Sequence, residues 1–176
     1  MAERFRVYAE GLPEEVLSTN RPPGKAREDD FHVTVKYGLK VVDPDEAAEV
    51  VEGTEPFEVV LGRSGAFHGT GEDVVLKVRA QSRGLEALNR MVCLRLDHES
   101  SFLEYRPHVT VAYLRRSLVD PYGYRELFDD SFEGERFEVD RLVMTTPGGN
   151  EHVIPLLGRR AKVVSRMTDA ISRRTR

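Results

Sequence analysis

The chain has 176 residues, of which 40% are hydrophobic, and a net charge of −4 at pH 7. That length fits one domain with a packed core, and the composition excludes a disordered chain. The single cysteine, Cys93, excludes an intramolecular disulfide and a cysteine-based zinc site. The negative charge argues against a general nucleic-acid coat protein. No apolar run could cross a bilayer and the charged N-terminus lacks a signal-peptide core, so we expect a soluble cytoplasmic protein without membrane partners.

Alternating residues, cap residues and proline–glycine loops predict the elements of the first half. In chain order these are a strand over 4–10, a short helix over 13–18, a polar loop over 21–30, a strand over 31–39, a helix over 43–53 and a strand over 56–61. Asp43 begins the helix because a proline and two acids follow it, which is typical of an N-terminal cap.

A glycine-rich loop, GRSGAFHGTGE, connects to the second half of the chain. There the predicted elements are a strand over 73–79, a helix over 82–96, a strand over 106–114, a helix over 119–128 and strands over 136–145 and 151–156. Ser82 caps the long helix, in which Leu85, Leu88 and Val92 recur at helical spacing. The loop lacks the lysine of a phosphate-binding P-loop, so a hairpin connection explains it.

The stretch HVTVKYGL, residues 32–39, returns as HVTVAYL at residues 108–114. The order strand–helix–strand–helix–strand also occurs twice. We therefore expect an α+β fold built by duplication, with two lobes of mainly antiparallel sheet backed by helices around a central cleft. This bilobal domain spans 1–157, with repeat units at about 4–66 and 73–157.

Positive charge is concentrated in the last part of the chain, residues 158–176, which hold seven basic residues and one acid. A solvated basic tail or helix is the simpler interpretation. An electrostatic arm for RNA or another acidic partner is the alternative.

The repeated stretch places a histidine and a threonine on the same face of each predicted strand. Because side chains alternate along a strand, His32 projects with Thr34, and His108 projects with Thr110, while the valines between them anchor each strand. Imidazoles, whose pKa is ordinarily near neutrality, can act as general base and general acid on opposite sides of one phosphorus atom. Threonine hydroxyls can donate hydrogen bonds to the non-bridging phosphate oxygens. No metal is needed to activate the nucleophile.

The segments HVTV at 32–35 and at 108–111 resemble the paired HxTx motifs of the two-histidine (2H) phosphoesterase superfamily. That group includes bacterial enzymes called 2′–5′ RNA ligases and the cyclic nucleotide phosphodiesterases. The resemblance covers about residues 4–156, and Pro107 fits the family's Pro-His-x-Thr second motif. It implies a bilobal, pseudo-symmetric fold and metal-independent cleavage of a phosphodiester. The working residues that it implies are His32, Thr34, His108 and Thr110.

Three further residues are candidate substrate contacts. Lys36 shares the face of His32 and could attract the phosphate, although a lysine reaching solvent from the strand end is as good an explanation. Tyr8, with Arg6, could face the cleft and stack on a base, and a half-buried strand tyrosine is the equal alternative. The tyrosines that follow each motif, Tyr37 and Tyr113, are predicted to be packing residues.

The leading hypothesis is a phosphodiesterase, without cofactor or metal, acting on an RNA end or a small nucleotide. Its substrate would be a 2′,3′-cyclic phosphate, a 2′–5′ linkage or a cyclic oligonucleotide. The near-identity of the motifs leaves open whether His32 or His108 is the base. A catalytically silent module that binds RNA or nucleotides, and an RNA ligase running the reverse reaction, are the alternatives. A metal site fits less well, because no cysteine or patterned carboxylate set accompanies the histidines.

Overall fold

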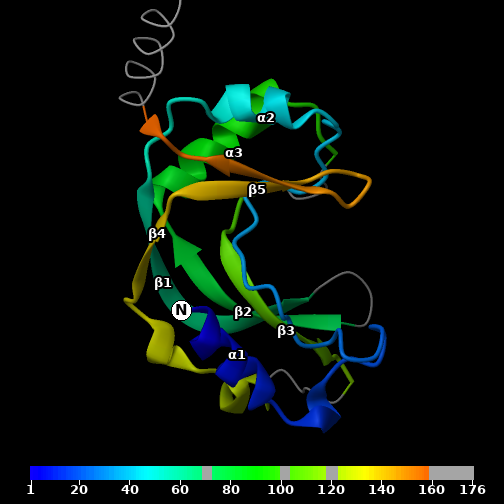
Figure 1. The fold of residues 1–176 in the computed structure, drawn as a ribbon. Coiled ribbons are helices and arrows are strands. Elements are labelled where there is room, and N and C mark those ends of the chain that lie inside the picture. The colour runs from blue at the N-terminus through cyan, green and yellow to red at the C-terminus, as the bar shows by residue number, and fades with distance from the viewer. Residues whose placement is uncertain (69–72, 100–103, 118–122, 159–176) are drawn as a thin grey trace, which may run out of the picture. The chain divides into compact units, whose positions relative to one another are not determined.

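The computed structural model describes residues 1–68, 73–99, 104–117 and 123–158 (Figure 1). They form two compact units, between which the chain passes several times. The first unit holds residues 1–34, 60–81 and 106–137. The second holds residues 35–59, 82–105 and those from 138 on.

A curled antiparallel sheet dominates the first unit. The four strands lie in the order β3-β2-β1-β4 and span β1 (Phe57–His68), β2 (Asp73–Gln81), β3 (His108–Arg115) and β4 (Arg136–Val139). The helix α1 (Ala2–Glu10) contacts β3 and lies below the strands in Figure 1. Short 3-10 helices span Glu14–Val16, Gly123–Leu127 and Asp130–Phe132. Phe5 of α1 stacks on Phe31 and on Phe132, which fixes the helix to this unit.

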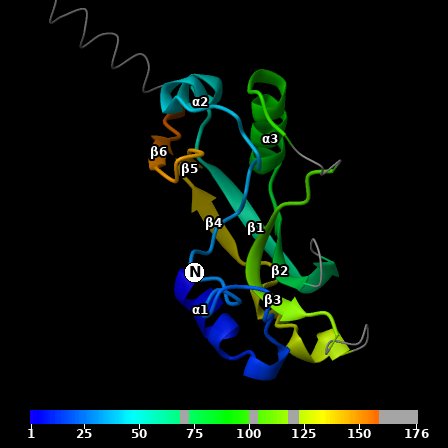
Figure 2. The ribbon, with the colours of Figure 1, turned by 90° about the vertical axis from the view of Figure 1, so that its right-hand side faces the viewer.

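The second unit contains two helices and a hairpin. They are α2 (Pro44–Val51), α3 (Arg83–Arg95), β5 (Arg141–Thr145) and β6 (Glu151–Pro155). Figure 2 shows α2 beside the β5–β6 hairpin. Leu88 and Val92 of α3 pack with Val50 of α2 and with Met144 and Ile154 of the hairpin. One apolar core therefore holds all four elements together.

Both predicted helix caps are confirmed. The Asp43 carboxylate accepts a hydrogen bond from the Asp45 N–H at 2.9 Å, and the Ser82 hydroxyl accepts one from the Gly84 N–H at 3.1 Å. The strands predicted at 73–79, 106–114 and 151–156 are also confirmed. The strand predicted at 136–145 is two strands, which separate at Asp140. The α+β class with antiparallel sheets is thus confirmed.

The strand predicted over 4–10 is wrong, because these residues form α1. In a strand, the alternation of RFRVYAE would set Phe5 and Val7 on the same face. Instead Phe5 and Ala9, four positions apart, are buried together, and Val7 is 62% exposed. The helical spacing continues into Leu12, which is also buried. Packing on neighbouring aromatic rings therefore decides this segment, rather than its local alternation.

The segment 31–39 is not the continuous strand that we predicted. It makes isolated bridges only at Val33 and Leu39. Gly38 has a φ of 74°, in the left-handed region that ends a strand. Tyr37, predicted to pack, is 72% exposed, so that prediction is wrong. Tyr113 is half-buried, with the Arg21 guanidinium 3.7 Å from its ring centroid.

Other parts of the sequence prediction need smaller changes. The predicted loop after residue 61 is mostly strand, since β1 continues to His68. Of the helix predicted over 119–128, residues 123–127 form a 3-10 helix and 118–122 lie outside the described residues. The basic tail from 159 on also lies outside them. None of the helices in the described ranges is long and apolar enough to cross a bilayer.

Candidate active site

The two repeated motifs meet along one edge of β3. Val33 makes an antiparallel bridge with Val109, which is 3% exposed. Residues that face each other in such a pair point to the same side, and their sequence neighbours point to the other side. Four residues therefore share the face opposite these valines: His32, Thr34, His108 and Thr110.

All four residues belong to the first unit, whereas the sequence analysis gave one pair to each half of the chain. Continuing the register of the Val33–Val109 bridge by one residue sets His32 across from Thr110 and Thr34 across from His108. The two histidines are then diagonal neighbours, with Cα atoms about 7 Å apart. The charge of His32 lowers the pKa of His108, which agrees with neighbouring imidazoles.

Each imidazole is oriented by a backbone carbonyl two residues earlier. Nδ1 of His32 lies 2.7 Å from the Asp30 carbonyl oxygen, and Nδ1 of His108 lies 2.7 Å from the Arg106 carbonyl oxygen. A carbonyl only accepts hydrogen bonds, so Nδ1 carries the proton in both neutral rings. Nε2 is then the atom that exchanges a proton. His98, in the second unit, makes the same local contact with the Leu96 carbonyl at 2.9 Å, so the contact alone does not define an active site.

His108 is the more enclosed of the two histidines. Its ring meets Phe67 edge-on with centroids 5.4 Å apart, and the Lys77 ammonium lies 4.7 Å from the same Phe67 ring. Burial lowers the pKa of His108, and the charges of Lys77 and His32 lower it further against the opposing hydrogen bond to Arg106. The neutral imidazole, which is the form that a general base needs, is thereby favoured near pH 7.

Two cations on β2 lie on the same face as His108 and Thr110 of β3. The sequence analysis did not single them out. In the β2–β3 pairing, Lys77 is opposite Thr110 and Arg79 is opposite His108. Burial lowers the pKa of Lys77, as do the charges of Arg79 and Arg106. The alternation of Lys77 and Arg79 with buried residues was the available signal, but only the strand register shows which residues they accompany.

The segment that leads to His32 is held to β3 by isolated backbone bridges and also by side chains. The buried Asp73 carboxylate accepts hydrogen bonds from Ser18, Asn20 and Arg21. Burial raises the pKa of Asp73, but these hydrogen bonds and the Arg21 charge outweigh it, so the pKa lies below its ordinary value. Further along, the Arg27 guanidinium donates to the carbonyl oxygens of Ala9 and Leu12. These anchors hold the irregular segment beside β3.

Tyr8 and Arg6, two of the predicted substrate contacts, lie on α1 rather than on a strand. The Tyr8 hydroxyl donates to the Leu127 carbonyl at 2.6 Å and accepts from the Asp129 N–H at 3.2 Å. The Arg6 guanidinium is exposed and pairs with Glu3. The shared strand face on which we singled them out is absent, although contact with a substrate stays a prediction.

Lys36, the third predicted contact, belongs to the second unit, whose boundary falls after Thr34. Its side chain is half-buried. Contact between Lys36 and a phosphate also stays a prediction.

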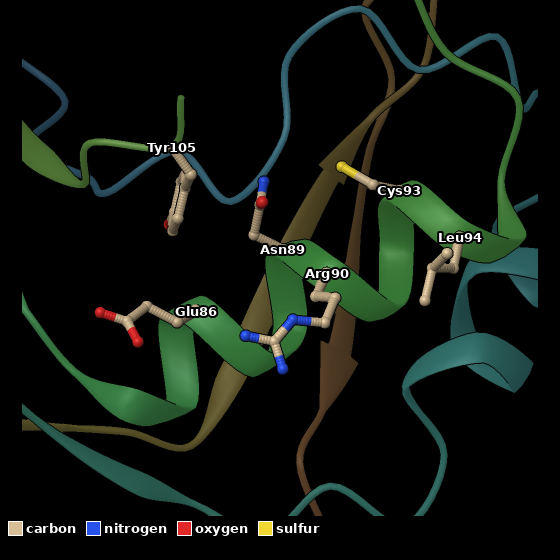
Figure 3. A pocket seen from close by; sticks show the side chains of 6 residues that line it. All are labelled: Glu86, Asn89, Arg90, Cys93, Leu94 and Tyr105. Carbon is tan, nitrogen blue, oxygen red and sulfur yellow. The ribbon is translucent and has the colours of Figure 1, made fainter. Parts of the chain in front are cut away.

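A hollow on α3 in the second unit is lined by none of these residues. Its volume is about 420 Å³, and it is lined by Glu86, Asn89, Arg90, Cys93, Leu94 and Tyr105. Figure 3 shows Asn89 and Cys93 projecting from α3, with Tyr105 on a separate segment. Burial, with the charge of Glu86, raises the pKa of the Tyr105 hydroxyl. Among the described residues, no group of three or more His, Cys, Asp or Glu side chains could hold a metal ion.

Comparison with known protein families identifies the family to which the chain belongs. A model described as the 2′-5′ RNA ligase superfamily matches residues 14–151, which include both HxT segments. The chain belongs to the 2′-5′ RNA ligase superfamily. This confirms the resemblance to the two-histidine phosphoesterases and supports an enzyme of that type, with RNA or nucleotide substrates implied by the family.

A solved structure has a similar fold. The crystal structure of TT0787 from Thermus thermophilus superposes with a TM-score of 0.53 and covers 90% of this chain and 92% of its own. The sequence identity is 16%, so the likeness supports the α+β fold alone. Among curated proteins, the comparison finds no match.

Proposed function

We propose that the protein is a metal-independent phosphodiesterase that uses His32 and His108 as a general acid–base pair on an RNA-derived phosphodiester. The observation that carries the proposal is the Val33–Val109 bridge, because it sets both histidines and both threonines on one face of the first unit. Family membership supports the substrate class.

The simplest reaction of this type is hydrolysis of a 2′,3′-cyclic phosphate. Neutral His108 takes a proton from water through Nε2 as the water oxygen bonds to phosphorus. The bond from phosphorus to one ribose oxygen breaks, and protonated His32 gives its Nε2 proton to that oxygen. The product is a phosphomonoester, and proton exchange with solvent restores both rings. His108 is assigned as the base because its pKa is lowered.

The threonines stabilise the reacting phosphate in this scheme. Thr34 and Thr110 lie between the histidines on the shared face, so their hydroxyls donate to the non-bridging oxygens, on which negative charge builds up. The same residues serve the joining of RNA ends when the 5′-hydroxyl of a second RNA replaces the water. His108 then accepts the proton of that hydroxyl, and His32 still protonates the ribose oxygen that leaves phosphorus.

The test is a turnover screen of 2′,3′-cyclic mononucleotides, 2′–5′ dinucleotides and cyclic oligonucleotides. Wild type is compared with His32→Ala, His108→Ala and the control His98→Ala, which removes a ring with the same carbonyl contact in the second unit. We expect turnover that survives chelation with EDTA and is lost in the first two variants alone. Tight binding without turnover of any compound would instead support a binding module.

A further inference from the structure

The face that carries the candidate histidines holds more positive charge than one phosphodiester can neutralise. Lys77 and Arg79 alternate on β2 opposite Thr110 and His108, and Arg106 immediately precedes the second motif. The charges of Arg79 and Arg106 both act on the Lys77 ammonium. A single phosphodiester carries one negative charge, so it balances only one of the two β2 cations, Lys77 and Arg79.

Clustered like charges destabilise a fold, and the neighbouring strand places no acidic side chain between these cations. The neighbouring strand β1 contributes glycines where side chains could have separated the cations. A Cβ added at Gly62 would lie 3.2 Å from the Arg79 Cβ, so a side chain there would crowd the base of Arg79. Gly65 is the β1 partner of Lys77, and a Cβ there would meet no atom within 4 Å. Open space thus lies beside the cations.

The positions of the cations divide them into two groups. Lys77 pairs with Thr110, so both can serve the phosphate that reacts. Arg79 lies two residues further along β2, so its Cα is about 7 Å from that of Lys77. This step is comparable with the spacing of successive phosphates along a nucleic-acid strand. Guanidinium groups also suit phosphate, because they present several donors in one plane.

We propose that Arg79 and Arg106 form a second phosphate subsite, which binds the phosphate next in the chain to the one that reacts. The inference rests on the proposed function and narrows its substrate class to oligonucleotide-type esters with at least two phosphates. A 2′,3′-cyclic mononucleotide fills only the reacting position. The negatively charged internucleotide linkage of a longer substrate lies against the two arginines.

The test compares two dinucleotides that both end in a 2′,3′-cyclic phosphate. One has an ordinary phosphate linkage, and the other has an uncharged methylphosphonate linkage with the same bases and length. In wild type, we expect kcat/KM to be roughly tenfold higher for the charged linkage, as for a hydrogen bond between charged groups. In Arg79→Gln, we expect this ratio to fall close to one.

Arg63→Gln is the matched control. It removes the same charge from an exposed arginine of the first unit that is already paired with Asp130 at 2.7 Å. The ratio stays at its wild-type value in this variant. Equal kcat/KM for the two linkages in wild type, or an unchanged ratio in Arg79→Gln, would overturn the subsite.

A binding measurement separates failure of the subsite from failure of the proposed function. If wild type turns over neither dinucleotide, the hydrolytic function fails, and the subsite is then tested with dinucleotides that end in a 3′-phosphate. Tighter binding of the charged linkage by wild type, lost in Arg79→Gln, supports the subsite. Equal affinity for the two linkages contradicts it.

Discussion

The two repeated motifs have the same letters but different structural support. His108 begins a regular strand, β3, and is half-buried against Phe67. His32 lies on an irregular segment that makes only isolated bridges to β3, the nearest at Val33, and its side chain is 58% exposed. A repeated sequence therefore need not produce two equivalent groups, because neighbouring elements decide burial and charge.

This difference gives the two histidines different chemical tendencies. Burial and the Lys77 charge lower the pKa of His108, which favours the neutral base. His32 lies close to the Asp30 carboxylate, with Nδ1 and Oδ2 3.5 Å apart. The two motif histidines therefore differ in their electrostatic surroundings although their sequence motifs are the same.

The largest expected effect comes from deleting either ring. His32→Ala and His108→Ala should each lower kcat by about 10²–10⁴-fold, the range for loss of a general acid or base. Steady-state turnover of a 2′,3′-cyclic substrate measures this loss. His98→Ala is the control and should keep wild-type kcat. Full activity in His32→Ala would contradict the claim that the two motifs act together in catalysis.

Removing a threonine hydroxyl should have the next largest effect. Thr110→Val keeps the side-chain shape and β-branching but loses a donor to the phosphate, so we expect kcat to fall by about 10²-fold. Thr34→Val should cost less, because Thr34 lies on the irregular segment. Kinetics of the two variants measured side by side check the order, and a larger loss in Thr34→Val would contradict it.

Weakening the anchor of the His32 segment tests the difference in support. Asp73→Asn removes the charge that Ser18, Asn20 and Arg21 hydrogen-bond, so the free energy of unfolding should fall by about 2 kcal/mol at pH 7. Urea denaturation measures the loss. Asp130→Asn, on an exposed ion pair with Arg63, is the control and should change stability much less.

The same carboxylate predicts how stability depends on pH. The folded-state pKa of Asp73 lies below its unfolded value of about 3.9. Its stabilisation is therefore complete above the unfolded pKa and is lost as the pH falls through the folded pKa. Wild type should lose stability faster than Asp73→Asn below about pH 4. Parallel curves for the two proteins would show that Asp73 does not titrate in this way.

The smallest effect concerns the electrostatic neighbour of His108. The charge of Lys77 lowers the pKa of His108, so Lys77→Met should raise it. The acidic limb of the pH profile of kcat/KM should then move to higher pH by a few tenths of a unit. Arg63→Gln should leave this limb in place. A shift of this limb to lower pH in Lys77→Met would contradict the claim that the charge of Lys77 lowers the pKa of His108.

Local sequence was enough to predict the two motifs, the caps at Asp43 and Ser82, and most of the strands. These features depend on neighbours within a few residues. It failed for α1, where burial of Phe5 against distant rings overrides the alternation. It also missed Lys77 and Arg79, because their importance comes from the β2–β3 register, which joins residues about thirty positions apart. Duplication of the two halves stays a prediction.

The central claim is that the two imidazoles lie close together on one face, and an NMR titration of His108 tests it most directly. In wild type, the pKa of His108 should lie below the ordinary histidine value of about 6.5. In His32→Ala it should rise, because the positive charge of the neighbouring imidazolium is gone. A His108 titration curve that is identical with and without His32 would contradict the account.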